Sequence, residues 1–215
     1  MTDAQTAPRP KSAADPAARG SEDLWLNAAY EVLVTAGVDA VKVMPLAQAL
    51  GLSRTSFYWH FKDREALLAA LLDKWEAKNT GNLVARTRAY AETINEAIYN
   101  VFDCWLTREL FDSRLDFAIR NWALGDGAVK AKLQRTDEAR IAAIREMFER
   151  FGYASGHAET RALTLYYTQI GYISMMVAEP RDIRIARMPA YVETFSGHAP
   201  EAAETARFMA RHADS

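Results

Sequence analysis

The chain has 215 residues, of which 50% are hydrophobic and 25% charged, with a formal net charge of −2. This composition allows a sizeable buried core in one or two domains. We find no apolar run long enough to span a bilayer. The single cysteine, Cys104, excludes an intramolecular disulfide and fits a reducing compartment, so we expect a cytoplasmic protein.

Residues 1–20 are rich in proline, alanine, threonine and serine and lack an apolar signal core. We expect neither a signal peptide nor a membrane anchor there, but a largely disordered tail. Its basic residues could contact the DNA backbone or minor groove, as basic arms do, or the tail could be passive. These basic residues are Arg9, Lys11 and Arg19.

The first helix is predicted to begin near Ser21 and to stop at Gly37. Glu22 and Asp23 lie in its first turn, where the helix dipole favours acidic side chains. The helical period predicts an inward face made of Trp25, Ala28, Ala29, Val32 and Leu33.

Residues 45–61 predict two short helices joined by a tight turn. Pro45 fits the first turn of a helix, where a missing N–H costs nothing. The small Ala47, four residues before Gly51, would let the two helices approach, and Gly51 tolerates the positive φ that ends the first of them. Ser53 is a natural N-cap for the second.

The second of these helices has two contrasting faces. Phe57 and Phe61 are four apart and would face inward, which leaves polar and aromatic side chains outside. From Lys42 to Arg64 there are four basic residues and one acid, so the positive excess is local, as phosphate binding requires. The alternative is an ordinary helical hairpin with an exposed aromatic rim.

This region resembles the tetracycline-repressor (TetR) family of bacterial transcription regulators, from about Trp25 to Leu72. The similarity lies in Trp25 to Leu33, Gly37, Leu46-Ala47, Gly51-Leu-Ser, Tyr58-Trp-His-Phe61 and Arg64-Glu-Ala-Leu-Leu. Lys42 stands where the family usually has Thr, which puts one phosphate contact in doubt. Arg64 replaces the usual Lys, which keeps the charge but changes the donor geometry.

A DNA-reading role can be assigned to each outer residue of this segment. Arg54 and Thr55, at the helix N-terminus, are the candidates for base contacts, and Trp59 for sugars or thymine methyls. His60 has the alternative role of packing beneath the helix. The predicted DNA-binding set, in which the remaining members would hold phosphates, is Lys42, Arg54, Thr55, Ser56, Tyr58, Trp59, His60, Lys62 and Arg64.

We call the helix-turn-helix domain over residues 21–66 the reader. A fourth helix, capped by Asp63 and apolar from Leu67 to Trp75, is expected to connect the reader to the rest of the chain. We therefore divide the chain into a tail over residues 1–20, a helix-turn-helix domain over 21–66 and a larger helical domain over 67–215. The predicted fold class is all-α.

Apolar stripes predict further helices over residues 94–105 and 115–122, with Ser113 as a plausible cap, and a long helix over 128–151. Gly125 and Gly127 mark a turn and lack the strand and third glycine of a dinucleotide loop. Phe102 and Trp105 beside Cys104 suggest that this cysteine is a buried hydrophobic side chain.

The stretch from residue 158 to 179 is apolar or aromatic nearly all round, so one side would pack on the chain's own core and the other on a partner. A final helix over residues 200–212 has a small-residue face of Ala202, Ala206, Met209 and Ala210 that could complete an intersubunit bundle. The resemblance also implies a dimer. The alternative is the central core helix of a monomer.

The resemblance further implies that the second domain holds a small molecule whose binding moves the fourth helix. The candidate lining residues, each of which could instead be a core residue, are Tyr99, Phe102, Trp105, Asn121, Trp122, Tyr166, Gln169 and Tyr172.

The sequence thus favours a dimeric repressor that binds a palindromic operator in double-stranded DNA and is released by a small-molecule effector. A helical protein-binding adaptor and a small helical enzyme are the alternatives. We expect no enzyme, cofactor or metal, because the four histidines are scattered without metal spacing and we find no P-loop or His-Glu-x-x-His.

Overall fold

The computed structural model describes residues 20–213, and within this range the chain is helical, without strands. The predicted tail, with Arg9, Lys11 and Arg19, lies outside the described residues. The elements are α1 (Glu22–Ala36), η2 (Val38–Ala40), α2 (Val43–Leu50), α3 (Arg54–Phe57), α4 (Arg64–Trp75), η3 (Glu76–Thr80), α5 (Gly81–Arg88), α6 (Ile94–Leu106), α7 (Ser113–Ala123), α8 (Gly127–Arg150), α9 (Ser155–Ser174), α10 (Arg181–Ser196) and α11 (Ala202–Arg211).

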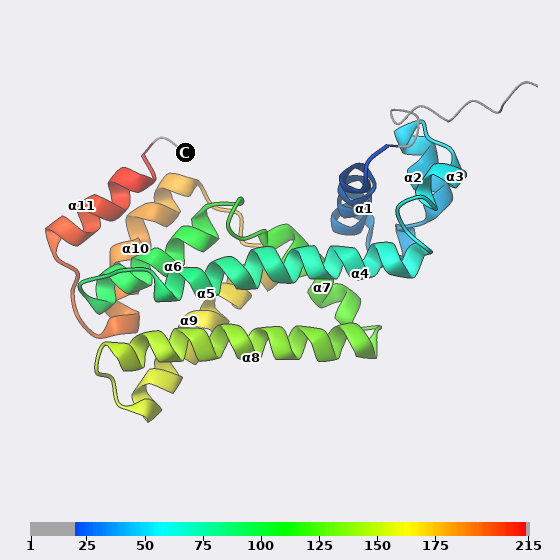
Figure 1. The fold of residues 1–215 in the computed structure, drawn as a ribbon. Coiled ribbons are helices and arrows are strands. Elements are labelled where there is room, and N and C mark those ends of the chain that lie inside the picture. Colours follow the sequence, from blue (N-terminus) through cyan, green and yellow to red (C-terminus); the bar gives the residue numbers. More distant parts are fainter. Residues whose placement is uncertain (1–19, 214–215) are drawn as a thin grey trace, which may run out of the picture.

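One long helix organises the molecule, because α4, η3 and α5 run on without a break. Figure 1 shows helices α1 to α3 at the end where α4 begins and α11 near the opposite end. The η3 segment is π-helical. Such turns are often found at functional sites.

Four of the predicted helix boundary signals are confirmed. Ser21, Ser53 and Asp63 each accept a hydrogen bond from a backbone N–H in the first turn of the following helix, and Gly37 follows α1 with φ 81°. The cap predicted at Ser113 is one residue off, because the Asp112 carboxylate caps α7 through Leu115 N at 3.0 Å.

The apolar core around the reader continues past residue 66. Trp25, Leu33 and Phe57 are buried in the same cluster as Leu67 to Trp75 of α4 and several residues of α7. Tyr30 of α1 also donates a hydrogen bond to Asp112 Oδ2 at 2.8 Å. The reader is therefore seated on both α4 and α7, and the division at residue 66 stays a prediction.

A second core fills the larger domain between α6, α8, α9, α10 and α11. Cys104 is buried in it, as predicted, and burial raises the pKa of its thiol to about 12. Such a thiol is un-ionised at neutral pH.

Two predictions about the C-terminal part need correction. The helix expected up to residue 179 ends at Ser174, and Met176 takes a positive φ of 50°. Sequence reasoning also missed α10, which packs on α6 and lies beside α9. The predicted last helix is present as α11; it packs on α6, with Phe208 stacked on Tyr99, and leaves Ala202, Ala206 and Ala210 exposed.

Candidate DNA-binding surface and effector pocket

The turn between α2 and α3 has the predicted geometry. Gly51 is left-handed at φ 65°, and the N–H of Leu52 reaches back to the carbonyl of Ala47 at 2.9 Å. This bond pattern satisfies carbonyls that a helix end leaves free. No atom lies within 4 Å of a Cβ built on Gly51, so the backbone conformation, and not lack of space, favours glycine there.

The inward face of the second helix is anchored on aromatic residues. Phe57 is buried against Trp25 in an edge-to-face contact with centroids 5.2 Å apart, and it stacks on Phe61 at 5.5 Å. Only Arg54–Phe57 is α-helical, and residues 58–60 form a turn. These contacts hold the short helix in one orientation.

The outward face consists of exposed polar and aromatic side chains. Trp59 and Tyr58 expose 63% and 46% of their surface, and Arg54, Thr55 and Lys62 are exposed as well. The guanidinium of Arg54 donates to the Tyr58 hydroxyl from Nε at 3.2 Å and from Nη2 at 2.9 Å. This pairing of Arg54 with Tyr58 restrains a side chain that we predicted to contact bases.

Ser56 and His60 of the predicted DNA-binding set make contacts with the backbone of the chain. Ser56 is buried and its hydroxyl donates to the Ser53 carbonyl at 2.7 Å, which argues against its predicted phosphate contact. His60 Nε2 lies 3.1 Å from the carbonyl oxygen of Gly20, as the packing alternative required.

Arg64 fastens the segment before α2 to the start of α4. Its Nε donates to the Val41 carbonyl at 2.5 Å and its Nη2 to the Val38 carbonyl at 2.7 Å. Two of the guanidinium nitrogens with which Arg64 could bind a phosphate are therefore hydrogen-bonded to the chain's own backbone. Lys42, at the N-cap position of α2, has an exposed side chain that forms no capping bond.

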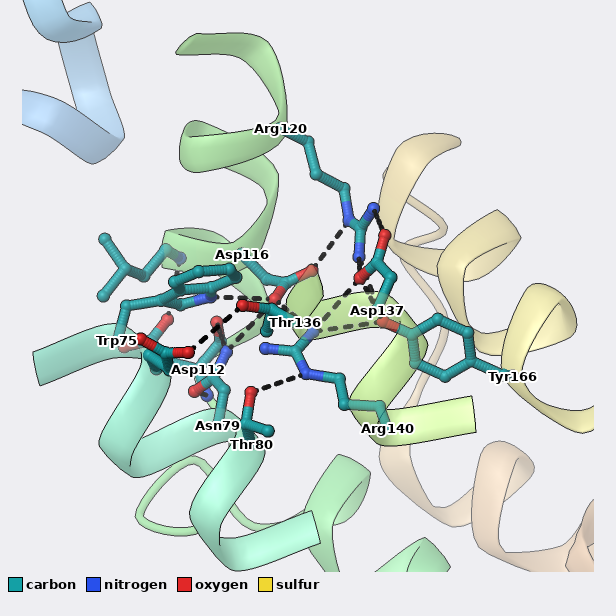
Figure 2. Close-up of polar contacts among 12 residues, drawn as sticks. Trp75, Asn79, Thr80, Asp112, Asp116, Arg120, Thr136, Asp137, Arg140 and Tyr166 are labelled. Carbon is teal, nitrogen blue, oxygen red and sulfur yellow. Dashed lines mark hydrogen bonds and ion pairs between the residues drawn. The ribbon is translucent and has the colours of Figure 1, made fainter. Parts of the chain in front are cut away.

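A buried polar network joins the long helix to α7, α8 and α9 (Figure 2). At its centre the Asp116 carboxylate accepts hydrogen bonds from Trp75 Nε1 at 2.9 Å, Arg140 Nη1 at 2.9 Å and Arg120 Nε at 2.8 Å. Burial alone would raise the pKa of Asp116, but the two arginines and these hydrogen bonds outweigh it and lower the pKa.

The same network reaches the π-helical segment and α9. Arg140 donates to Thr80 Oγ1 at 2.9 Å and to the Tyr166 hydroxyl at 3.1 Å. Asn79 exchanges hydrogen bonds with the backbone N–H and carbonyl of Asp112 at 2.9 and 3.1 Å. The long helix is thus tied through polar contacts to the helices of the larger domain.

A small pocket lies between α6, α9 and α10. It contains four of the eight predicted ligand residues, Phe102, Trp105, Gln169 and Tyr172. Its remaining lining, which sequence reasoning did not select, is Leu165, Thr168, Arg184, Met188, Tyr191 and Phe195.

The other four predicted ligand residues lie elsewhere. Tyr99 is buried against Phe208 of α11, and Tyr166 belongs to the polar network. Asn121 and Trp122 line a different hollow, between α4 and α7. Sequence reasoning assigned these four residues to the pocket wrongly, because helical periodicity indicates the buried face of each helix but not which helices pack together there.

The missed α10 supplies four of the pocket residues. Met188, Val192 and Phe195 follow a helical spacing of buried apolar residues that was available as a signal. Pro189 inside this helix and the many charges around it obscured that signal.

Comparison with known proteins identifies the reader. Residues 26–71 match the family model described as bacterial regulatory proteins, tetR family. This range spans α1 to the body of α4, including the turn at Gly51 and the exposed face of α3. Through these residues the chain is similar to the tetR family.

The curated relatives that the chain matches are tetracycline repressors. The class A protein from transposon 1721 of Escherichia coli is 38% identical over 61 residues, which is 28% of each chain. The class D protein of Escherichia coli is 41% identical over 54 residues, or 25% of each chain. The similarity thus spans only about a quarter of these tetR-family relatives.

Solved tetR-family structures show that the fold similarity extends further. Mycobacterium smegmatis AmtR has a TM-score of 0.62 at 15% identity, over 95% of this chain and 98% of that one. A putative TetR-family transcriptional regulator from Rhodococcus sp. has a TM-score of 0.59 at 16% identity, over 81% of this chain and 98% of that one. The all-α architecture, with an N-terminal helix-turn-helix domain and a larger helical domain, is therefore that of the family.

Within residues 20–213 no helix combines the length and the apolar character needed to cross a membrane. Nor do the described His, Cys, Asp and Glu residues gather in a group of three or more that would hold a metal ion.

Proposed function

We propose that this chain is a transcription regulator that binds double-stranded DNA through the exposed face of α3. The observation that carries the proposal is the contrast between the two faces of this segment. Phe57 and Phe61 fix it from behind, while Arg54, Thr55 and Trp59 stand at its surface. An ordered set of cationic and aromatic groups on a helix-turn-helix suits base and backbone contacts in a major groove.

We propose a homodimer as the DNA-binding form. Tyr167 on α9 exposes 59% of its surface, and the neighbouring α10 exposes Ile183, Ala186 and Ala190. The hydroxyls of Thr160 and Thr164 donate to carbonyls of α9 itself, so their donor protons are already paired within the helix.

This surface of α9 and α10 would bury well against its own two-fold copy. The contribution predicted for α11 through its alanine face stays part of the proposal. Two readers in such a dimer would contact half-sites about 34 to 36 Å apart on a palindromic operator.

We propose that the larger domain senses a small-molecule effector that releases the DNA and that the protein acts as a repressor. The pocket is lined by Leu165, and the next residue, Tyr166, donates to Asp137 Oδ1 at 2.6 Å within the polar network. A shift of α9 on ligand binding would therefore act on Arg140 and Asp116, and through Trp75 on α4. Two-state elements of this kind are how distant sites become coupled.

The adaptor and the enzyme are less well supported. The matched family model is one of regulatory proteins, and the family similarity lies in the DNA-binding domain. Binding to a protein alone would not explain why positive charge is concentrated over residues 42–64, around α3. An experiment that detects DNA binding therefore distinguishes the regulator from the adaptor, which would bind protein alone.

The test is a gel-shift and footprinting experiment with the DNA upstream of the chain's own gene. We expect a palindromic footprint and an affinity that falls steeply as salt rises, because phosphate contacts release counterions. The Tyr90→Ala variant, changed at an exposed residue after α5, is the matched control and should bind unchanged. Absence of DNA binding at low salt would contradict the proposal and favour the adaptor.

A further inference from the structure

The pocket between α6, α9 and α10 holds two buried N–H donors without acceptors. Trp105 is 7% exposed, and its indole Nε1 has no hydrogen-bond partner within the described part of the chain. The same is true of Nε of Arg184, which reaches the pocket from α10. Buried donors are nearly always paired, so two unpaired ones in one pocket indicate a missing acceptor.

The side-chain oxygens of the other polar residues in this pocket already take part in hydrogen bonds. The hydroxyls of Tyr172 and Tyr191 lie 2.9 Å apart, and the Thr168 hydroxyl donates to the Thr164 carbonyl at 2.7 Å. Gln169 Oε1 accepts from Arg184 Nη2 at 3.1 Å. The lining residues therefore leave two donors unpaired. Oε1 of the nearby Glu179 is a buried acceptor that is also unpaired, but Glu179 does not line the pocket.

The charge of Arg184 is only partly compensated. No carboxylate forms an ion pair with it among residues 20–213, and the nearby Glu179 pairs with Arg187 at 2.9 Å instead. Burial lowers the pKa of Arg184 more than Tyr172, Glu179 and Tyr191 raise it. An arginine stays protonated at neutral pH all the same, so a cation is held in a partly desolvated site.

The rest of the lining is aromatic and aliphatic. The guanidinium of Arg184 lies over the Tyr172 ring, 5.0 Å from its centroid, and Tyr191 stacks on Phe195 with centroids 5.8 Å apart. In this structure the free space between these side chains is only about 20 Å³, the room of about one water molecule, so a ring enters only when the lining side chains move apart.

Resting on the proposed effector role of this pocket, we propose that its ligand is an aromatic carboxylate. The ring would lie among Phe102, Tyr191 and Phe195, and the carboxylate would accept hydrogen bonds from Arg184 and Trp105. This assigns the chemical class of the effector, with Arg184 as the residue that selects the anion. A carboxylate is the acceptor that a guanidinium recognises best, because it takes charge-assisted bonds from it.

The test compares 2-naphthoate with its neutral isostere 2-naphthamide by isothermal titration calorimetry on the full-length protein without DNA. Benzoate with benzamide serves as the one-ring pair. We expect each carboxylate to bind about 10-fold or more tightly than its amide, as a charge-assisted bond in a buried site should give. Arg184→Gln should abolish this preference, and Trp105→Phe should weaken carboxylate binding while keeping the aromatic surface.

The matched control is Arg88→Gln, which removes an exposed arginine of α5 that lines none of the described pockets and pairs only with Glu146 at 3.7 Å. It should keep the preference, and circular dichroism of each variant checks that it is folded. Equal affinity for carboxylate and amide, a preference that survives in Arg184→Gln, or no binding of any probe at millimolar concentration would overturn the proposal. The titrations contain no DNA, and DNA binding is measured in a separate experiment. If the protein failed to bind DNA, the preference for the carboxylate could still be judged.

Discussion

Arg140 and Asp116 form a fully buried ion pair, with Nη1 2.9 Å from Oδ1 and both side chains 0% exposed. The guanidinium also lies over the Trp75 ring at 5.0 Å from its centroid. Desolvating two charges costs several kcal/mol each, so a pair of this kind is retained more for the arrangement it fixes than for net stability. Here it fixes the long helix against α7 and α8.

Removing one partner of this pair should be strongly destabilising. We expect Asp116→Ala to lower the free energy of unfolding by roughly 3–5 kcal/mol, because it leaves the buried Arg140 with only the longer ion pair to Asp137 at 3.8 Å. Urea unfolding followed by circular dichroism measures this. The control is Asp73→Ala, which breaks an exposed pair with Lys132 and should cost about 1 kcal/mol or less. Similar losses of unfolding free energy in both variants would show that the buried pair contributes no more to stability than the pair of Asp73 with Lys132.

Acid should weaken the fold through the same carboxylate. The pKa of Asp116 in the folded chain lies below its ordinary value, so the unfolded chain binds the proton more readily. The stabilisation is complete above the ordinary carboxylate pKa of about 4 and is lost as pH falls through the lower folded value. Unfolding free energies from pH 7 downwards should therefore fall more steeply for the wild type than for Asp116→Asn. Parallel pH profiles would contradict this assignment.

Substitutions in the reader should separate base reading from backbone binding. We expect Arg54→Ala to cost about 1–3 kcal/mol on the specific operator and to relax the preference at one base pair. Lys62→Ala should instead weaken specific and random DNA alike, because a phosphate contact carries no sequence information. Fluorescence anisotropy with both kinds of DNA measures this, and equal losses for Arg54→Ala on the two would remove its base-reading role.

The turn at Gly51 should tolerate no other small residue without a cost. Gly51→Ala places a side chain at φ 65° and should destabilise the fold by about 1–2 kcal/mol. Gly81→Ala is the matched control, since Gly81 is helical with φ −57° and open space around its Cβ. That change should stabilise the protein by about 0.5–1 kcal/mol, and thermal unfolding distinguishes the two signs.

A charge on the exposed face of α9 should break the proposed dimer. Tyr167→Glu places a carboxylate at the centre of the α9 surface, where two-fold packing would bring two of them together. Tyr90→Glu, at a residue that is 83% exposed outside this surface, should leave the dimer intact. Sedimentation velocity measures the mass of each, and a dimeric Tyr167→Glu variant would place the interface elsewhere.

Local signals in the sequence gave correct predictions where the relevant atoms are close in sequence. The caps at Ser21, Ser53 and Asp63 and the left-handed Gly51 each depend on backbone groups within about four residues. Burial of Phe57 followed from helical spacing. The family resemblance rested on these same residues.

Contacts between distant segments were not predictable in this way. One local contact was missed as well: Ser56 was placed on the outer face, but its hydroxyl donates to the Ser53 carbonyl three residues away and the side chain is buried. Half of the predicted pocket residues lie outside the pocket, and Arg184 was missed because an arginine on a charged helix usually faces water.

The sequence by itself determined the helix caps, the turn and the two faces of the reader and its resemblance to the tetR family, because hydrogen bonds and side-chain spacing within a few residues set them. Only the tertiary structure decided that Trp75 meets Asp116, that Arg140 meets Thr80 and that Arg184 enters an aromatic pocket. Those pairings join segments 41 and 60 residues apart in the first two cases, and the packing of whole helices selects them.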